Sequence, residues 1–422
     1  MEGSCRSLGS DGSVTALALI TDIRKFQSHG SESHDIENDV HGECSNNGPG
    51  DGVMGRDCFA MVGMCSRLLV IDVFSGKLVA SALALPFGLR IHGIRWIPWS
   101  FGDEESQQCM ILVVHGRNCL SYWELKVGGP NGDVKLCKLC ESKGIEKWIY
   151  HVSLTVLFSK DLKNRCVLAT VGCIDNSVML FHVDVSKKKE KLLGHAYGES
   201  RCLLYSMDVF DTLYNIDHKE ESCPGEAGNE AGYTCKIAGG TILWDITVWK
   251  LKAIIVTGER GTICIRDIST ENLFRLKGHR GSIHCVRWGS SGQILASGSD
   301  DRLVRVWRLD EMSDDRDGSN SKIVVVDKSD SELFGHKNRI WEIRFSSDDS
   351  LLFSGAEDGC LITWDLATSN RFSEIKVLSG NILHILLLYY CLNSRTDISL
   401  FIERRKITRG MKITLVDSQY LE

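Results

Sequence analysis

The stretch LKGHRGSIHCVRWGSSGQILASGSDDRLVRVWRL, residues 276–309, is followed by a close copy, LFGHKNRIWEIRFSSDDSLLFSGAEDGCLITWDL, residues 333–366. Within each copy the histidine and the aspartate lie 22 residues apart, and a tryptophan follows the aspartate by 6. Such regular spacing is typical of stacked supersecondary units. Four distinctive positions recur with one offset of 57 residues: His279 and His336, Ser297 and Ser354, Asp301 and Asp358, Trp307 and Trp364.

Each copy has the pattern of short strands separated by polar turns, and no helical period fits either copy. The Gly278-His279 start, the Ser297-Gly298 pair before an acidic turn and the Trp364-Asp365 ending resemble the WD-repeat family. That resemblance implies four-stranded blades arranged around a central channel.

Weaker versions of the same strand pattern precede the two clear copies. Runs of alternating apolar residues occur in segments 59–73, 91–125, 148–183 and 194–250, and segment 254–268 has the pattern of a further strand pair. We therefore expect an all-β fold, a WD40 β-propeller of about seven blades that is incomplete at its C-terminus.

The expected domain division places the propeller at residues 1–371 and a separate, non-propeller tail at residues 372–422. The tail has no Gly-His pair, no acidic turn and no Trp-Asp ending. Three segments rich in polar or charged residues are expected to be loop excursions from the propeller, at residues 24–56, 214–233 and 310–332.

Composition indicates a cytoplasmic, globular protein. Of the 422 residues, 43% are hydrophobic and 25% charged, and the 17 cysteines have no framework spacing, so we expect free thiols. The first dozen residues lack the pattern of a secretory signal, and the longest apolar run is too short for a membrane helix. A net charge of -6 argues against a stand-alone nucleic-acid binder, which needs many basic contacts to phosphate.

The side chains of His279, Ser297 and Asp301 are those of a hydrolytic triad. The other interpretation is a buried hydrogen-bond chain, in which the aspartate orients the histidine and the serine accepts from the indole of Trp307. A second copy at equal spacing has no evident use in catalysis, whereas a repeat architecture needs one per blade. We therefore expect two structural tetrads and no catalytic residue.

Other motifs give weaker signals, and for each of them we favour a structural role over a binding site. Residues 50–55 match a dinucleotide-binding fingerprint without its strand and helix. Cys137 and Cys140 form a lone pair without zinc-ribbon spacing, and residues 29–44 contain three histidines and a cysteine in a polar loop. The lysines of residues 187–191 fit a solvated turn better than a phosphate site. We expect no cofactor and no metal.

The order of several less regular pieces is more specific. Residues 91–93, 175–178, 200–202 and 246–249, followed by the two clear copies, resemble the first propeller of the WD-repeat protein six family, over about residues 58–364. This resemblance implies a non-catalytic subunit that directs an FtsJ-type methyltransferase to 2′-O-methylate nucleotide 34 of tRNA. The RNA would be contacted through the complex, and S-adenosylmethionine would belong to the partner.

The chain differs from the family pattern in two respects, and one alternative function remains. Leu243 stands where the turn aspartate is expected, six residues before Trp249, which predicts an incomplete hydrogen-bond chain in that blade. Members of the family are also much longer than this chain. The rival is a generic adaptor, such as a substrate receptor of a cullin-type ubiquitin ligase, although residues 364–367 lack the basic residue such receptors often carry after Trp-Asp.

Overall fold

Every regular element that the structure describes is a β-strand, as the sequence pattern predicted. Within the described residues there is no helix that could cross a membrane. The computed structural model describes residues 14–20, 59–72, 76–99, 107–128, 133–142, 144–158, 165–198, 202–215, 229–257, 263–309, 323–376, 381–392, 395–405 and 414–416.

The first three sheets each contain four antiparallel strands that neighbour one another in chain order. The first consists of β1 (Val14–Ile20), β2 (Phe59–Met64), β3 (Arg67–Asp72) and β4 (Leu78–Leu83). The second consists of β5 (Gly93–Pro98), β6 (Gln107–His115), β7 (Leu120–Gly128) and β8 (Asp133–Glu141). The third consists of β9 (Ile149–Phe158), β10 (Arg165–Cys173), β11 (Ser177–Asp184) and β12 (Lys189–Tyr197).

The next sheets continue this pattern, with one additional short strand. The fourth contains β13 (Leu204–Asn215), β14 (Asn229–Thr241), β15 (Ile246–Thr257) and β16 (Ile263–Leu276), to which β20 (Val324–Val326) adds in parallel. The fifth contains β17 (Ile283–Trp288), β18 (Ile294–Ser299), β19 (Val304–Arg308) and β21 (Ser331–Leu333). The sixth contains β22 (Ile340–Phe345), β23 (Leu351–Ala356), β24 (Cys360–Asp365) and β25 (Asn370–Lys376), and the seventh contains β26 (Asn381–Leu392), β27 (Arg395–Arg405) and β28 (Thr414–Val416).

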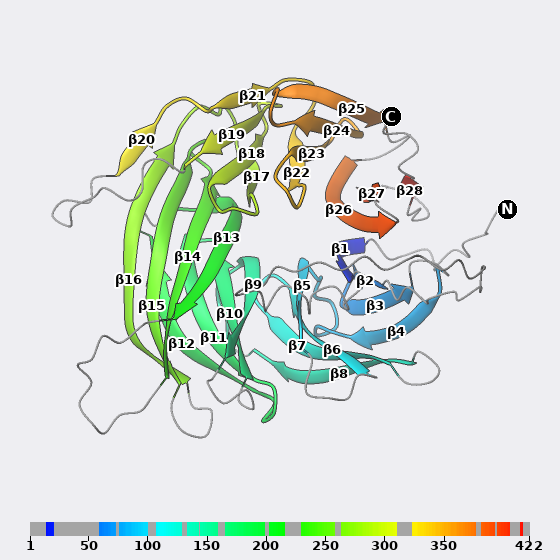
Figure 1. Ribbon diagram of the computed structural model, residues 1–422, viewed down its shortest axis with the longest axis vertical. Coiled ribbons are helices and arrows are strands. Elements are labelled where there is room, and N and C mark those ends of the chain that lie inside the picture. Colours follow the sequence, from blue (N-terminus) through cyan, green and yellow to red (C-terminus); the bar gives the residue numbers. More distant parts are fainter. Residues whose placement is uncertain are drawn as a thin grey trace, which may run out of the picture.

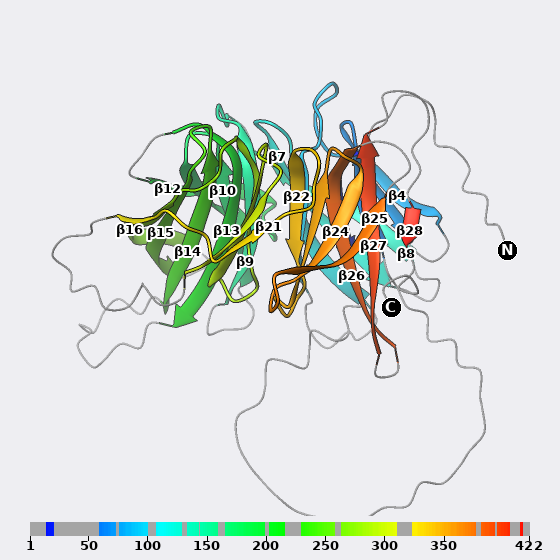
Figure 2. The ribbon, with the colours of Figure 1, turned by 90° about the horizontal axis from the view of Figure 1, so that it is seen from above.

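The seven sheets follow one another around a single axis (Figure 1). The first strand of each sheet is innermost, and these inner strands are neighbours in the order β1, β5, β9, β13, β17, β22 and β26. β26 in turn lies beside β1, and Figure 2 shows the sheets side by side as blades. The expected β-propeller of about seven blades is confirmed, and its C-terminal sheet has three described strands.

The hydrophobic core is divided into clusters that lie between successive sheets. Met61 and Val70 of the first sheet pack with Leu112 and Trp123 of the second, for example. Further clusters join the second sheet to the third, the third to the fourth, the fourth to the fifth and the fifth to the sixth. The second to fifth sheets therefore bury both faces on their neighbours, which explains why their strands are apolar on both faces.

The expected excursions overlap with strands where they are described. Residues 24–56 lie outside the described residues, as do residues 216–228 and 310–322. β13 and β14 extend into the two ends of segment 214–233, where Tyr233 is fully buried. β20 and most of β21 fall within segment 310–332.

The backbone of the C-terminal segment is also in strands. β25 belongs to the sixth sheet, and β26 to β28 form the seventh. The structure does not describe the side chains after residue 376. The division into a propeller at residues 1–371 and a separate tail at residues 372–422 therefore stays a prediction.

A buried histidine is accommodated by a glycine on the neighbouring strand. His115 on β6 pairs with Gly93 on β5, and a Cβ atom at Gly93 would lie only 2.1 Å from its Nε2 atom. Burial, together with the smaller effect of the Arg95 charge, lowers the pKa of His115 from 6.5 to about 3. The ring is therefore neutral in the folded protein at physiological pH.

This histidine should make the fold acid-sensitive. The pKa is depressed in the folded state, so the unfolded chain binds the proton first, and stability present above pH 6.5 is lost as the pH falls toward 3. The contribution of His115 should decline by about 1 kcal/mol for each pH unit between 6 and 4. Urea unfolding at pH 7 and pH 5 should show a smaller loss for His115→Gln than for the wild type. If the free energy of unfolding fell equally in both proteins, His115 would not be the source of the acid sensitivity.

Candidate functional site

The four recurring side chains of the first repeat meet in the fifth sheet. Ser297 lies on β18 and Trp307 on β19, whereas His279 precedes β17 and Asp301 lies in the turn between β18 and β19. The Nδ1 atom of His279 is 2.8 Å from Oδ2 of Asp301, and its Nε2 atom is 2.8 Å from Oγ of Ser297. The indole of Trp307 donates to the same Oγ atom over 3.1 Å.

The second repeat has the same arrangement in the sixth sheet. Nδ1 of His336 is 3.2 Å from Oδ2 of Asp358, and Nε2 is 2.8 Å from Oγ of Ser354. Trp364 donates to that Oγ over 2.7 Å. Burial alone would raise the pKa of Asp358, but hydrogen bonds from His336 and from two backbone N–H groups lower it to about 2. The Asp358 carboxylate is therefore charged at physiological pH.

The chemistry available to Ser297 is restricted by its surroundings. Its side chain is fully buried, and its oxygen is already bonded to the histidine and to the indole. Burial lowers the pKa of His279, which outweighs the opposing effect of the Asp301 carboxylate. A hydrolytic serine has to reach a substrate, whereas this hydroxyl satisfies two buried nitrogen atoms.

In the fourth sheet, the buried indole of Trp249 has a different kind of acceptor. Trp249 donates its indole N–H to Oδ1 of Asn176 in the third sheet, over 2.9 Å. The turn after β14 does contain an aspartate, but at Asp245, which accepts from the Thr241 hydroxyl and from Nε of Arg275. With Leu243 at the aspartate position, the indole of Trp249 takes its acceptor from the preceding sheet and not from a serine of its own blade.

Two of the weaker motifs cannot be located among the described residues. Residues 29–44 and 50–55 lie outside the described residues. Cys137 and Cys140 are free thiols on β8, and burial raises the pKa of Cys140 to about 12. No group of three possible metal ligands is found among the described residues.

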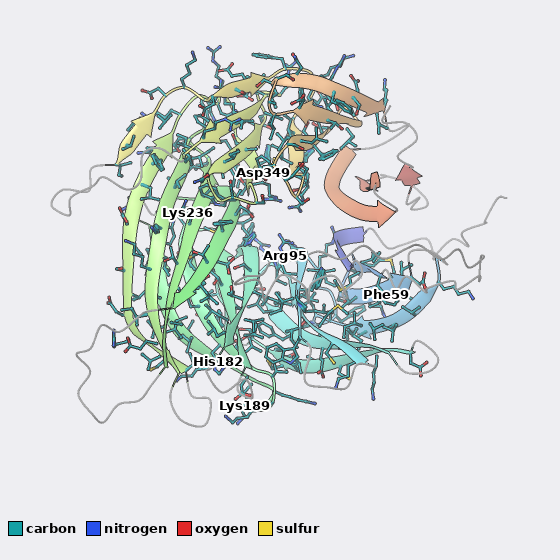
Figure 3. All side chains as sticks on the ribbon, in the orientation of Figure 1. Phe59, Arg95, His182, Lys189, Lys236 and Asp349 are labelled. Atoms are coloured by element: carbon teal, nitrogen blue, oxygen red, sulfur yellow. The ribbon has the colours of Figure 1, made fainter. Side chains whose placement is uncertain are left out.

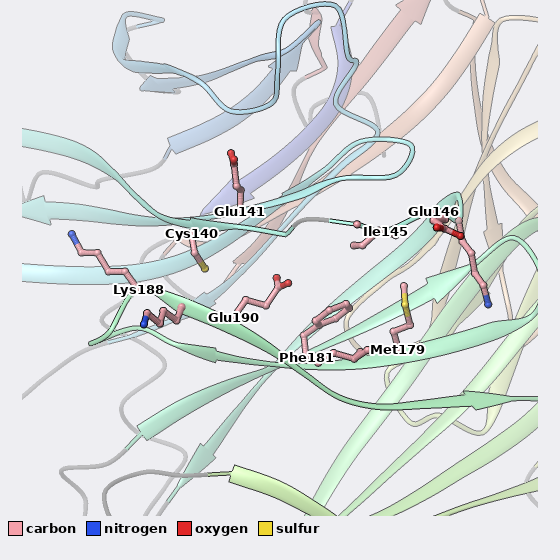
Figure 4. A pocket seen from close by; sticks show the side chains of 12 residues that line it. Cys140, Glu141, Ile145, Glu146, Met179, Phe181, Lys188 and Glu190 are labelled. Carbon is pink, nitrogen blue, oxygen red and sulfur yellow. The ribbon is translucent and has the colours of Figure 1, made fainter.

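Lys188 and Lys189, two of the lysines of residues 187–191, line a pocket between the second and third sheets. The cavity has a volume of about 740 Å³. Figure 4 shows Cys140 and Glu141 on one side of it and Phe181 and Glu190 on the other. The Glu190 carboxylate accepts from the Ser142 hydroxyl over 2.6 Å, and burial raises its pKa. Both carboxylates and lysines line the pocket, so it has no single charge preference.

Several exposed large apolar side chains lie near the starting ends of the inner strands. We define the aromatic rim as five side chains: Trp148, Tyr205, Trp244, His284 and Trp341. The rings of Tyr205 and His284 are 5.6 Å apart, and those of His284 and Trp341 are 4.6 Å apart. Three large aliphatic side chains beside the rim are also exposed: Leu203, Ile242 and Leu243.

Backbone hydrogen bonds hold the parts of the aromatic rim together. The N–H of Ile174 donates to the carbonyl of Trp148, and the N–H of Leu204 donates to the carbonyl of Ile174. Trp244 is 52% exposed at the tip of its turn and has a φ of 69°. This left-handed conformation is unfavourable for a bulky residue, and such positions cluster at functional surfaces.

Two arginines extend the aromatic rim. The guanidinium of Arg117 lies 3.2 Å from the ring centroid of Trp148, and that of Arg339 lies 5.7 Å from the ring centroid of Trp341. Arg339 is also paired with Glu357. Stacked aromatic and guanidinium groups are enriched where proteins bind other proteins.

Comparison with known proteins identifies the repeats. Residues 270–308 and 328–365 match the family model described as WD domain, G-beta repeat. The chain is 29% identical to protein hir-1 of Neurospora crassa over 33% of its length, 31% identical to protein HIR1 of Cryptococcus neoformans over 34%, and 28% identical to protein HIRA of Oryza sativa over 29%.

These matches cover a limited part of the relatives. The aligned regions span 13%, 16% and 12% of the three proteins, respectively. None of the three is named as a regulator of tRNA methylation, so the narrower resemblance to the WD-repeat protein six family gains no support from them. Taken with the seven sheets, the repeat match shows a β-propeller fold that contains two WD repeats, at residues 270–308 and 328–365.

Proposed function

We propose that this chain is a non-catalytic WD-repeat adaptor that docks a protein partner on the aromatic rim. The observation that carries the proposal is the exposure of large apolar side chains on one rim of consecutive blades. An exposed apolar patch edged by charged side chains is typical of protein interaction sites. Arg117 and Arg339 provide that edge.

The tetrads support a scaffolding role. Their serines are buried and bonded to a histidine and an indole, and the same geometry occurs twice. We propose that they hold the strands of each blade in register and that neither takes part in a reaction. A rigid ring then presents its loops in fixed positions, which lowers the entropic cost of binding.

The adaptor proposal can be tested on the turn that carries Leu243 and Trp244. Replacing both by serine should reduce capture of the bound partner at least tenfold, because exposed aromatic anchors contribute most of the energy at such interfaces. The measurement is quantitative mass spectrometry of proteins co-purified from the native cell extract. A matched control replaces Leu78 and Val79, which are exposed on the outer strand β4. Equal loss in both variants, or in neither, would rule out the aromatic rim.

A more specific form of the proposal names the partner as an FtsJ-type methyltransferase that acts on nucleotide 34 of tRNA in the cytoplasm. It is supported by the resemblance of residues 91–93, 175–178, 200–202 and 246–249 to the WD-repeat protein six family. Deleting the gene and measuring 2′-O-methylation of nucleotide 34 tests it directly. Unchanged methylation would remove this partner and leave the general adaptor, of which a receptor in a cullin-type ligase is one example.

A further inference from the structure

Charged side chains gather where the inner strands approach one another. Arg95 comes from β5, Asp208 from β13, Arg287 from β17, and Glu342 and Arg344 from β22. Figure 3 shows Arg95 near the centre of the ring, where these strands converge. The five side chains, which we call the central charge cluster, influence one another electrostatically although they belong to four blades.

Both carboxylates of the cluster are already engaged. Glu342 accepts from Nη2 of Arg287 over 2.7 Å and lies 3.4 Å from Nη2 of Arg344. Asp208 accepts from the backbone N–H of Trp288 over 2.8 Å, and its other oxygen is 3.1 Å from Nδ1 of His151. Neither carboxylate is hydrogen-bonded to the remaining guanidinium, that of Arg95.

Among the described residues, no carboxylate forms a hydrogen bond or an ion pair with Arg95. Within the described part of the chain, its one hydrogen bond goes to the carbonyl oxygen of Ile94, the preceding residue. Nε of Arg287 is buried and has no acceptor among the described residues. The two inner strands whose side chains are not described, β1 and β26, contain no aspartate or glutamate in their sequences, VTALALI and NILHILLLYYCL.

The cluster therefore has an excess of positive charge. It contains three guanidiniums and two carboxylates, and burial together with the nearby arginines lowers the pKa of His151 well below 6.5, so this ring is neutral. A further carboxyl on β13, Asp211, is bonded to the Thr155 hydroxyl, and burial raises its pKa.

The positive groups are also the more accessible ones. The Arg344 side chain is 30% exposed and that of Arg287 16%, whereas Glu342 is 4% exposed. The carboxylate thus lies behind the guanidiniums that it holds in place. Burial and the charges of Arg344 and Arg287 lower the pKa of Arg95 to about 10, a sign that its positive charge is poorly compensated.

We propose that the central charge cluster is a binding site for an oxyanion of the phosphate class, with Arg95 as its principal ligand and Arg287 and Arg344 beside it. Planar guanidinium groups donate two parallel hydrogen bonds to such anions, and an anion here would supply the missing negative charge. This site is separate from the aromatic rim and does not depend on which partner the rim binds.

Thermal unfolding of the full chain tests the proposal, with inorganic phosphate added against sodium chloride of equal ionic strength. Saturating phosphate should raise the Tm of the wild type by about 2 °C, since a ligand that binds only the folded state stabilises it. Arg95→Gln should abolish the phosphate-dependent shift and leave the Tm without phosphate unchanged or higher, because it removes an uncompensated charge. Arg95→Lys should keep part of the shift.

The control is Arg117→Gln, an exposed arginine outside the cluster, which should keep the full shift. The same unfolding measurement is repeated with tripolyphosphate in place of phosphate. A larger shift at lower concentration would identify a polyphosphorylated ligand, and an equal shift would identify the single phosphate group. A shift that persists undiminished in Arg95→Gln, or no shift in the wild type with either anion, would overturn the proposal. Loss of partner capture through Leu243 and Trp244 would not affect this result.

Discussion

Replacing Trp307 by alanine should lower the free energy of unfolding by about 3–5 kcal/mol. The Trp307 side chain is 1% exposed and packs between the fourth and fifth sheets, with Leu295 and Val286 among its neighbours. Its removal leaves a cavity in that interface and deprives Ser297 of its indole donor. Urea unfolding followed by far-ultraviolet circular dichroism measures the change.

The control for this variant is Trp244→Ala. Trp244 is an exposed tryptophan on the aromatic rim, so its removal should change the free energy of unfolding by no more than about 0.5 kcal/mol. If the free energy of unfolding fell equally in both variants, packing of Trp307 between the two sheets would not be what stabilises the fold. Comparing the buried with the exposed tryptophan shows how much of the loss comes from buried packing.

Ser297→Ala distinguishes the structural and hydrolytic interpretations of the tetrad. The structural role predicts a loss of about 1–3 kcal/mol, because the buried nitrogens of His279 and Trp307 lose their shared partner. The hydrolytic interpretation predicts loss of an activity with stability unchanged. An ester-hydrolysis screen beside the unfolding measurement would contradict the structural role if activity disappeared in a fully stable variant.

The tetrads could be located from the sequence because their geometry depends on local spacing. The 22 residues from His279 to Asp301 and the 6 from Asp301 to Trp307 recur in the second copy, so one repeat served as a check on the other. The same reasoning failed at Trp249, whose partner Asn176 lies 73 residues earlier and in another sheet. A local spacing rule cannot find an acceptor that another blade supplies.

The aromatic rim and the central charge cluster could not be predicted for the same reason. Tyr205, His284 and Trp341 are far apart in the chain, and only the ring places their side chains against one another. Each of the three follows the start of its inner strand by one residue, and that shared position is the signal that sequence reasoning could have used. Arg95 gives no such signal, because its isolation depends on where Asp208 and Glu342 are already engaged.

Glu342 should be among the most sensitive positions of the ring. Replacing it by leucine removes the carboxylate that Arg287 and Arg344 share and leaves two guanidiniums beside Arg95 without compensation. Burial alone would lower the pKa of Arg287, but the carboxylates of Glu342 and Asp208 raise it overall, which shows how strongly this cation depends on them. Breaking a buried ion pair on one side costs about 3–5 kcal/mol, and urea unfolding should show a loss of this size.

The double variant Arg287→Met with Glu342→Leu gives the decisive comparison. It removes both partners, so no buried charge of that pair is left uncompensated, and most of the lost stability should return. A double variant as unstable as the sum of the two single variants would mean that the charges act independently. Recovery would instead show that the carboxylate is retained to hold the guanidiniums in position. A propeller that needs only stability could replace this pair by apolar side chains, whereas one that binds an anion at its centre could not.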